Sequence, residues 1–234
     1  QSLTAADNAA ANNHLGNLLI QNGEAEAGMA CLLHATRVDP RYGIGWNSLG
    51  LAQLAQGDTE AATASFRTAI PLLPRFADVH HNLGDALATT KRYDEAVASY
   101  RTALQMAPDD PTIRNNLALS LSSMGQQDAA LALLRDSLQL DPYSGPVNLN
   151  LGRLLMERGE RDGALVAWHR AESAWREARA VDPGRANRSG GRRRRRGRRG
   201  REGRRAGAVR VRRRRRARTR PTAWRRRRPA RRGG

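Results

Sequence analysis

The sequence has a single cysteine, Cys31, and a single lysine, Lys91, among its 234 residues. One cysteine excludes an internal disulfide and a cysteine-based metal cluster, and it fits a reducing compartment, so we expect a cytoplasmic protein. No run of about 18 apolar residues is present, which predicts no membrane-spanning helix. The first residues lack the charged and then apolar pattern of a signal peptide, and they lack a methionine, so we expect a processed chain or a fragment.

Signals of chemistry are also absent. No two of the five histidines lie four residues apart, so the sequence predicts no zinc site. No glycine-rich loop lies between a strand pattern and a helix pattern, where it could bind a phosphate. We therefore predict no metal, no cofactor and no catalytic activity for this chain.

Charge is divided unevenly at Pro183. Residues 1–183 carry 15 basic and 21 acidic side chains, a net charge of −6, whereas residues 184–234 carry 26 arginines and one acid, a net charge of +25. The second segment has only Val209, Val211 and Trp224 as large apolar groups, too few to offset the entropy cost of ordering it. This composition predicts a folded acidic body and a disordered tail, rich in arginine and glycine, over residues 184–234.

The body contains an internal repeat of 34 residues. Four kinds of residue recur at this interval: a leucine followed by a small residue (Leu15, Leu49, Leu83, Leu117, Leu151), a proline (Pro40, Pro74, Pro108, Pro142), a small residue (Gly28, Ala62, Ala96, Ala130, Ala164) and a bulky residue (Leu32, Phe66, Tyr100, Leu134, Trp168). We place five repeats at 9–42, 43–76, 77–110, 111–144 and 145–178, after a lead-in over residues 1–8.

Each repeat is predicted to form two helices that pack against each other. Gly23, Gly57, Gly125 and Gly159 lie at the turn between the helices, where a left-handed residue is favoured, and Lys91 takes this place in the third repeat. The glycine or alanine at the eighth position allows a close approach, and the bulky residue of the second helix fills the space. One repeat cannot bury its apolar face alone, so the repeats must stack.

These motifs closely resemble the tetratricopeptide repeat family. The resemblance rests on Trp46-x-x-Leu49-Gly50, then Ala62-x-x-x-Phe66, Ala69 and Pro74. It implies an all-α fold, a right-handed α-solenoid of five helix-turn-helix repeats over residues 9–183. It also implies a protein-binding function, in which the first helices of successive repeats line a concave groove.

The last repeat departs from the common length. Residues 178–183 match a repeat ending, but they come seven residues late. This predicts a last helix extended to about residue 181, with an apolar stripe that includes Trp168 and Trp175. Either the long helix is a cap, or Trp175 docks onto a partner or onto a domain that this chain lacks.

The groove that the resemblance implies is rich in asparagine. Its candidate residues, at the fifth, sixth and ninth positions of the repeats, are Asn13, Asn17, Asn47, His81, Asn82, Asp85, Asn115, Asn116, Asn150 and Arg153. A carboxamide can donate to a peptide C=O and accept from its N–H, so stacked carboxamides could hold an extended peptide by its backbone. The ladder of sixth-position asparagines resembles the repeat domain of O-GlcNAc transferases. The alternative is that these asparagines pack between helices.

Three functions remain open. The leading hypothesis is a non-enzymatic scaffold that binds an extended peptide or protein segment, with no membrane or metal partner. The second is the repeat portion of a truncated or frameshifted glycosyltransferase-like enzyme. The third is non-specific nucleic-acid binding by the tail, through arginines such as Arg192, Arg193, Arg194, Arg212, Arg213, Arg214, Arg225 and Arg226. A GC-rich gene read out of frame would also produce such a tail.

Overall fold

The computed structural model describes residues 5–181, with the side chains of residues 8–178. The described residues form ten α-helices, one short 3-10 helix and no strand, which confirms the all-α prediction. The helices are α1 (Ala5–Asn22), α2 (Ala25–Val38), α3 (Gly43–Gln56), α4 (Thr59–Ala69), α5 (Ala77–Thr89), α6 (Tyr93–Met106), α7 (Pro111–Ser123), α8 (Gln127–Leu140), α9 (Gly145–Glu157) and α10 (Arg161–Val181), with η1 (Ile70–Leu72) after α4. Helix α1 begins four residues before the position from which the first repeat is counted.

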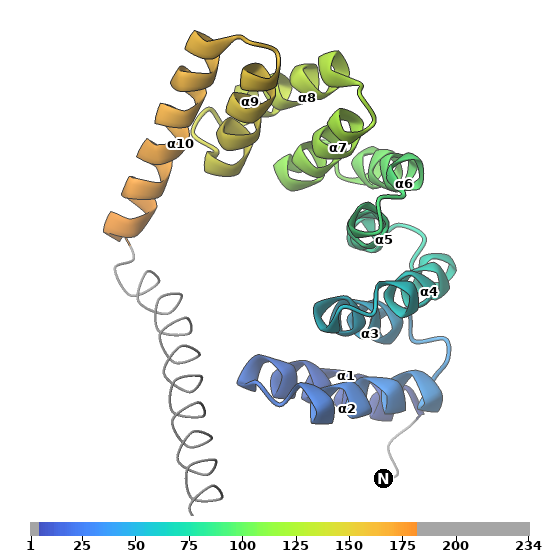
Figure 1. Cartoon of the computed structure of the whole chain (residues 1–234). Helices are drawn as coiled ribbons and strands as arrows, with labels where there is room; N and C mark the ends of the chain where they lie inside the picture. The colour runs from blue at the N-terminus through green and yellow to red at the C-terminus, as the bar shows by residue number, and fades with distance from the viewer. Residues whose placement is uncertain (1–4, 182–234) are drawn as a thin grey trace, which may run out of the picture. The chain divides into compact units, whose positions relative to one another are not determined.

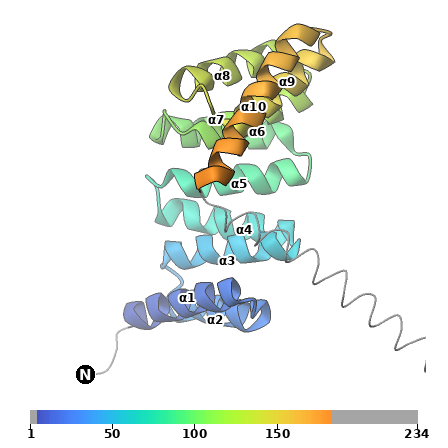
Figure 2. The same cartoon turned by 90° about the vertical axis from the view of Figure 1, so that its left-hand side faces the viewer.

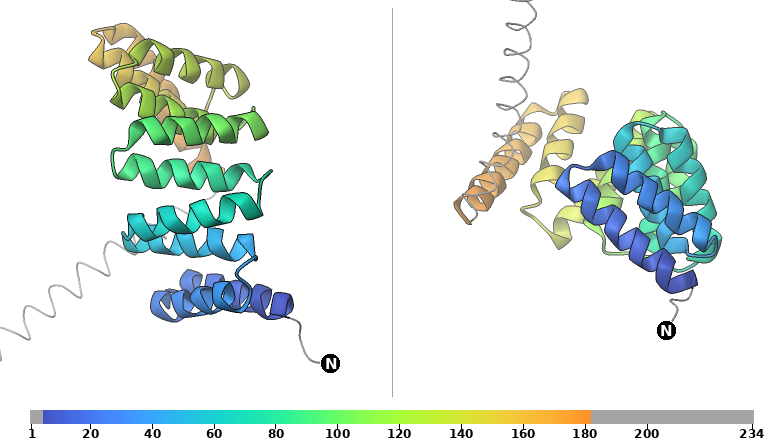
Figure 3. Two further views of the ribbon diagram at one scale, coloured as in Figure 1. Left: turned by 90° about the vertical axis from the view of Figure 1, so that its right-hand side faces the viewer. Right: turned by 90° about the horizontal axis from the view of Figure 1, so that it is seen from below.

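Residues 5–176 form one unit, in which consecutive helices pair and the pairs stack on one another. The stack curves, with the odd-numbered helices on its inner side (Figure 1). Among helices α1 to α9, successive odd-numbered helices contact each other from one repeat to the next more extensively than successive even-numbered helices do. The layered order is visible from both sides (Figures 2 and 3). Side chains on the inner helices of neighbouring repeats are therefore close enough to interact.

The two helices of a repeat meet at the small residue in the eighth position. A Cβ atom placed on Gly50 would lie 2.6 Å from the ring of Phe66, and one on Gly84 would lie 2.5 Å from the ring of Tyr100. In the last repeat, a Cβ on Gly152 would overlap the indole of Trp168. These distances are shorter than the contacts that real Cβ atoms make, so the glycine makes room for the bulky residue of the second helix.

The turns between the paired helices need a left-handed residue, as expected. The four turn glycines have φ values from 79° to 93°, and Lys91 takes φ 62° in the third repeat. A glycine adopts this conformation without the steric cost that a side chain brings. Each turn thus ends the first helix and reverses the chain, so that the second helix packs back on the first.

Helix α10 has 21 residues, longer than the other second helices. The indole of Trp175 lies over the start of α9, because a Cβ on Gly145 would be 2.7 Å from its Nε1. Trp175 is nevertheless 45% exposed. The extra turns thus carry an aromatic side chain that covers part of the last repeat, as the cap interpretation expects.

The apolar core is continuous from the second repeat to the fifth, but it is interrupted at the first. A separate small cluster of Leu32, Leu49 and Ala52 joins repeats one and two, with Trp46 touching both clusters. At the third position of a repeat, Val79, Ile113 and Val147 are buried in repeats three to five, but repeat two has Gly45 there. The first interface therefore lacks the buried valine or isoleucine that the other three have at this position.

Substituting Gly50 tests the packing at the eighth position. Gly50→Ala should destabilise the protein by about 1–3 kcal/mol, because the new methyl group overlaps Phe66, even though alanine favours a helix. Adding Phe66→Leu should recover part of the loss, since Ala118 and Leu134 occupy the same two positions in repeat four. Urea unfolding followed by circular dichroism measures both. A Gly50→Ala variant as stable as the wild type would contradict the packing account.

Candidate functional site

A chain of side-chain hydrogen bonds connects the inner helices. Asn82 Nδ2 on α5 donates to Asn47 Oδ1 on α3 at 2.9 Å. Asn150 Nδ2 on α9 donates to Asn115 Oδ1 on α7, also at 2.9 Å. In both pairs, the sixth position of one repeat donates to the fifth position of the preceding repeat. The predicted ladder is thus a set of bonds between repeats, with each asparagine held in one orientation.

The third member of the ladder joins a denser cluster. Asn116 Nδ2 donates to Asp85 Oδ1 at 2.9 Å and lies 3.1 Å from His81 Nε2. The hydroxyl of Tyr100 donates to the same Asp85 oxygen at 2.6 Å. Burial raises the pKa of the Tyr100 phenol, and the hydrogen bond to Asp85 raises it further. The Asp85 carboxylate is therefore held in place by donors from α6 and α7.

The ladder is broken between the first two repeats. The sixth position of repeat two is Ser48, whose hydroxyl accepts from Asn17 Nδ2 at a long 3.4 Å. Asn13, at the fifth position of repeat one, is only 7% exposed, and its Oδ1 is buried without a hydrogen-bond partner. A serine side chain is shorter than asparagine and does not make the bond that Asn82 and Asn150 make. Asn13 thus has an acceptor that its own interface does not satisfy.

The ladder leaves part of its hydrogen-bonding capacity unused. Asn82 and Asn150 are half-buried, and within residues 8–178 no side chain donates to their Oδ1 atoms. Exposed apolar side chains lie on the same helices: Leu51 on α3 is 44% exposed, and Leu149 and Met156 on α9 are each 42% exposed. The inner face therefore offers ordered carboxamides beside apolar surface.

Arg153, the remaining predicted groove residue, lies apart from the ladder. Its guanidinium donates to Glu157 Oε1 at 2.8 Å on the surface of α9, and both side chains are partly exposed. The structure thus joins nine of the ten predicted residues to the ladder or to its broken end, and leaves Arg153 outside.

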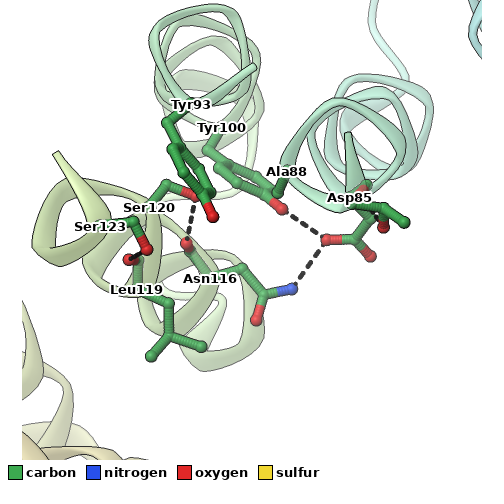
Figure 4. A pocket seen from close by; sticks show the side chains of 9 residues that line it. Asp85, Ala88, Tyr93, Tyr100, Asn116, Leu119, Ser120 and Ser123 are labelled. Atoms are coloured by element: carbon green, nitrogen blue, oxygen red, sulfur yellow. Dashed lines mark hydrogen bonds between the residues drawn. The ribbon is translucent and has the colours of Figure 1, made fainter. Parts of the chain in front are cut away.

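A cavity of about 390 Å³ opens beside the Asp85 cluster, between α5, α6 and α7 (Figure 4). Asp85 and Asn116, two of the ten candidate groove residues, line it together with seven side chains outside that set: Ala88, Thr89, Tyr93, Tyr100, Leu119, Ser120 and Ser123. The repeat register places Tyr100 at a packing position, so the sequence did not indicate that its hydroxyl would bind Asp85. The three serine and threonine residues of the lining, Thr89, Ser120 and Ser123, gave no signal that the sequence alone distinguishes from ordinary surface.

The sequence also led to predictions about membrane spans, metal sites and nucleic-acid binding. Among residues 5–181, no helix is both long and apolar enough to cross a membrane. The same part of the chain has no group of three His, Cys, Asp or Glu residues placed to hold a metal ion. The tail arginines proposed for nucleic-acid binding lie outside the described residues.

The repeats match a known family. The sequence model of the tetratricopeptide repeat matches three overlapping stretches, residues 13–75, 47–111 and 81–145. The chain belongs to the tetratricopeptide repeat family. No curated protein matches the sequence.

Solved tetratricopeptide repeat structures share the fold. A crystal structure of MamA has a TM-score of 0.64 at 18% identity, over 70% of this chain and 95% of that one. PilF of Pseudomonas aeruginosa has a TM-score of 0.63 at 22% identity, over 77% and 94%. YrrB, described as a TPR protein with an unusual peptide-binding site, has a TM-score of 0.59 at 20% identity, over 70% and 84%. Identities this low support the common fold and no more.

Completing the ladder should strengthen the first tetratricopeptide repeat interface. Ser48→Asn would place a donor opposite the unsatisfied Asn13 Oδ1, and should stabilise the protein by about 0.5–1.5 kcal/mol. The matched reverse change, Asn82→Ser, should destabilise it by a similar amount, because Asn47 Oδ1 loses its donor. Thermal unfolding measures the change, and hydrogen exchange in α1 and α2 locates it. Equal stability of the two variants would show that the ladder bonds contribute nothing.

The raised pKa of Tyr100 predicts a loss of stability in alkali. The unfolded chain releases this phenol proton near pH 10, whereas the folded chain retains it, so the stabilisation is complete below about pH 10 and declines as pH rises above it. Phenolate absorbance during a pH titration should show one of the four tyrosines ionising last, together with unfolding. In Tyr100→Phe this last step should disappear. If it persists in that variant, a different tyrosine is the buried one.

Proposed function

We propose that the inner face of the solenoid binds an extended segment of another protein, and that the chain acts as a non-catalytic scaffold. The observation that carries this proposal is the ladder, which orders carboxamides along successive repeats and leaves the Oδ1 atoms of Asn82 and Asn150 without a side-chain donor among residues 8–178. An extended peptide has one N–H and one C=O per residue that need partners. Carboxamides that are already oriented lose little conformational entropy when they bind such a backbone.

The apolar side chains on the same face supply a second contribution. Leu51 lies one turn after Asn47 on α3, and Met156 lies two turns after Leu149 on α9, so each pair shares a helix face. Burying an exposed leucine or methionine under a ligand side chain contributes about 25 cal/mol per Å² of apolar surface removed from water. Backbone contacts to the ladder and side-chain contacts to these residues together describe a site for a peptide with apolar residues.

The structural neighbours support this proposal only through the functions that their descriptions give. YrrB is described as having a peptide-binding site, and a solved structure of PilW, with a TM-score of 0.67 at 22% identity over 72% of this chain and 78% of that one, is described as a type IV pilus biogenesis factor. The proposal for this chain therefore depends on its own inner face. The cytoplasmic location remains a proposal based on the single cysteine.

Selection from a random peptide library tests the proposal. Peptides enriched on the immobilised full-length protein would be synthesised with a fluorescent label, and their affinity measured by anisotropy. Leu51→Asp should weaken binding by about tenfold or more, because it removes apolar contact and places a charge on the inner face.

The matched control is Leu33→Asp. Leu33 lies on α2, a second helix, and is 44% exposed, the same fraction as Leu51. It should leave peptide affinity unchanged. Equal losses in the two variants, or peptides that bind both as tightly as the wild type, would place the binding site elsewhere.

A further inference from the structure

The cavity beside Asp85 has walls from three helices. Helix α5 contributes Asp85, Ala88 and Thr89, α6 contributes Tyr93 and Tyr100, and α7 contributes Asn116, Leu119, Ser120 and Ser123 (Figure 4). At about 390 Å³ it lies near the lower end of the range of small-molecule pockets, which suits one long side chain better than a drug-sized ligand.

Most hydroxyl hydrogens in the cavity are already used. Thr89 donates to the backbone oxygen of Asp85 at 2.8 Å, and Ser120 and Ser123 donate to the backbone oxygens of Asn116 and Leu119, each at 3.0 Å. The Tyr100 hydroxyl donates to Asp85. A hydroxyl whose hydrogen is committed still has lone pairs to offer. These side chains therefore present acceptors to anything that enters.

Asp85 adds a negative charge to this group of acceptors. Its Oδ1 receives hydrogen bonds from Tyr100 and Asn116, and no described side chain donates to its Oδ2. The nearest basic group is His81, whose Nε2 lies 3.5 Å from Oδ1. No lysine or arginine lines the cavity, and the Asp85 side chain is 35% exposed. The carboxylate is thus oriented by its neighbours but lacks a full cationic partner.

We propose that this cavity binds the guanidinium or ammonium end of a basic side chain, from an arginine or lysine of the segment bound on the inner face. Such a group brings three to five N–H donors and a positive charge to a cavity that offers acceptors and a carboxylate. The apolar side chains of Ala88 and Leu119 can cover the methylene stem. This inference rests on the proposed peptide-binding function and names the side chain that the site selects.

The same chemistry has a second source within this chain, because residues 184–234 contain 26 arginines. An experiment must therefore separate a partner's basic residue from the chain's own. The cavity and its preference for a cation are common to both sources.

Binding of a single amino acid tests the cavity without any peptide. The probe is N-acetyl-arginine methylamide, and its neutral isostere N-acetyl-citrulline methylamide is the control ligand. Millimolar arginine probe should shift the side-chain amide resonances of Asn116 in the full-length protein, and citrulline should not. Asp85→Asn should weaken arginine binding by about tenfold or more, since a charge-assisted contact is lost. Equal shifts from the two probes, or equal affinity in wild type and Asp85→Asn, would overturn the proposal.

A second variant, which leaves Asp85 unchanged, tests the cavity in case Asp85→Asn fails to fold. Ser123→Arg places a guanidinium at the cavity from an exposed position whose hydroxyl bonds only its own helix, and it should abolish binding of the probe. Ser173→Arg is the matched control, because Ser173 is also exposed and bonds the backbone oxygen four residues earlier, on α10. Retained binding in Ser123→Arg would contradict the assignment.

Two further arms identify the source and separate this inference from the proposed function. In a full-length variant with the arginines of residues 184–234 changed to glutamine, tighter probe binding would identify the chain's own arginines as the occupant. Unchanged binding would leave the cavity free for a partner. Peptides selected from the library on the wild-type protein should carry an arginine or lysine. Peptides selected on the Asp85→Lys variant should lack this preference. Selected peptides with no basic preference overturn this inference alone, whereas the absence of any selected peptide overturns the proposed function.

Discussion

The contact between the eighth position of the first helix and the bulky residue of the second is the constraint on which the rest of the structure depends. Gly50 against Phe66 and Gly84 against Tyr100 leave no room for a further carbon atom. Each pair of helices therefore meets at the same point along its length. Because this point recurs in every repeat, each first helix presents its fifth and sixth positions at the same level as its neighbour. The regular bonds from Asn82 to Asn47 and from Asn150 to Asn115 follow from that register.

The first interface shows what happens when this regularity weakens. Gly45 replaces the buried valine or isoleucine of later repeats, and Ser48 replaces the donor asparagine. A buried acceptor without a partner, such as Asn13 Oδ1, costs about 1–3 kcal/mol. Repeats couple mainly to their nearest neighbours, so a deficit here is not compensated by the core of repeats two to five. The first interface consequently lacks both a buried branched side chain and a ladder bond that each later interface has.

The sequence predicted the helices and their pairing well because both depend on residue type at a fixed spacing. Glycine at a left-handed turn and a small residue opposite a large one are local requirements that any single repeat displays. The partners of the asparagines were not predictable in the same way, since spacing places Asn116 on the inner face but does not decide between a ligand, Asn115, His81 and Asp85. The cavity was even harder to predict from the sequence. Its acceptor character depends on where the hydrogens of Ser120, Ser123 and Thr89 point, and this requires the backbone oxygens of the helices themselves.

On the inner face, the fifth and sixth positions of a repeat have a different role from the ninth position. The fifth-position residues Asn47, His81 and Asn115 pair with the sixth-position residues Asn82, Asn116 and Asn150 of the next repeat, so the chemistry of these positions is restricted to side chains that pair across the interface. The ninth position is Asn17, Leu51, Asp85, Leu119 and Arg153 in turn, and thus changes from polar to apolar to charged along the stack. A ladder of similar carboxamides can bind a backbone but cannot distinguish one sequence from another, so selectivity must come from positions that vary.

Two of the ninth-position residues are charged. Arg153 is paired with Glu157 on its own helix, whereas Asp85 is held by Tyr100 and by Asn116 of the next repeat. A charge that is fixed in place loses less entropy on binding than one on a mobile side chain. Asp85 is therefore the position where the inner face can best discriminate among ligands.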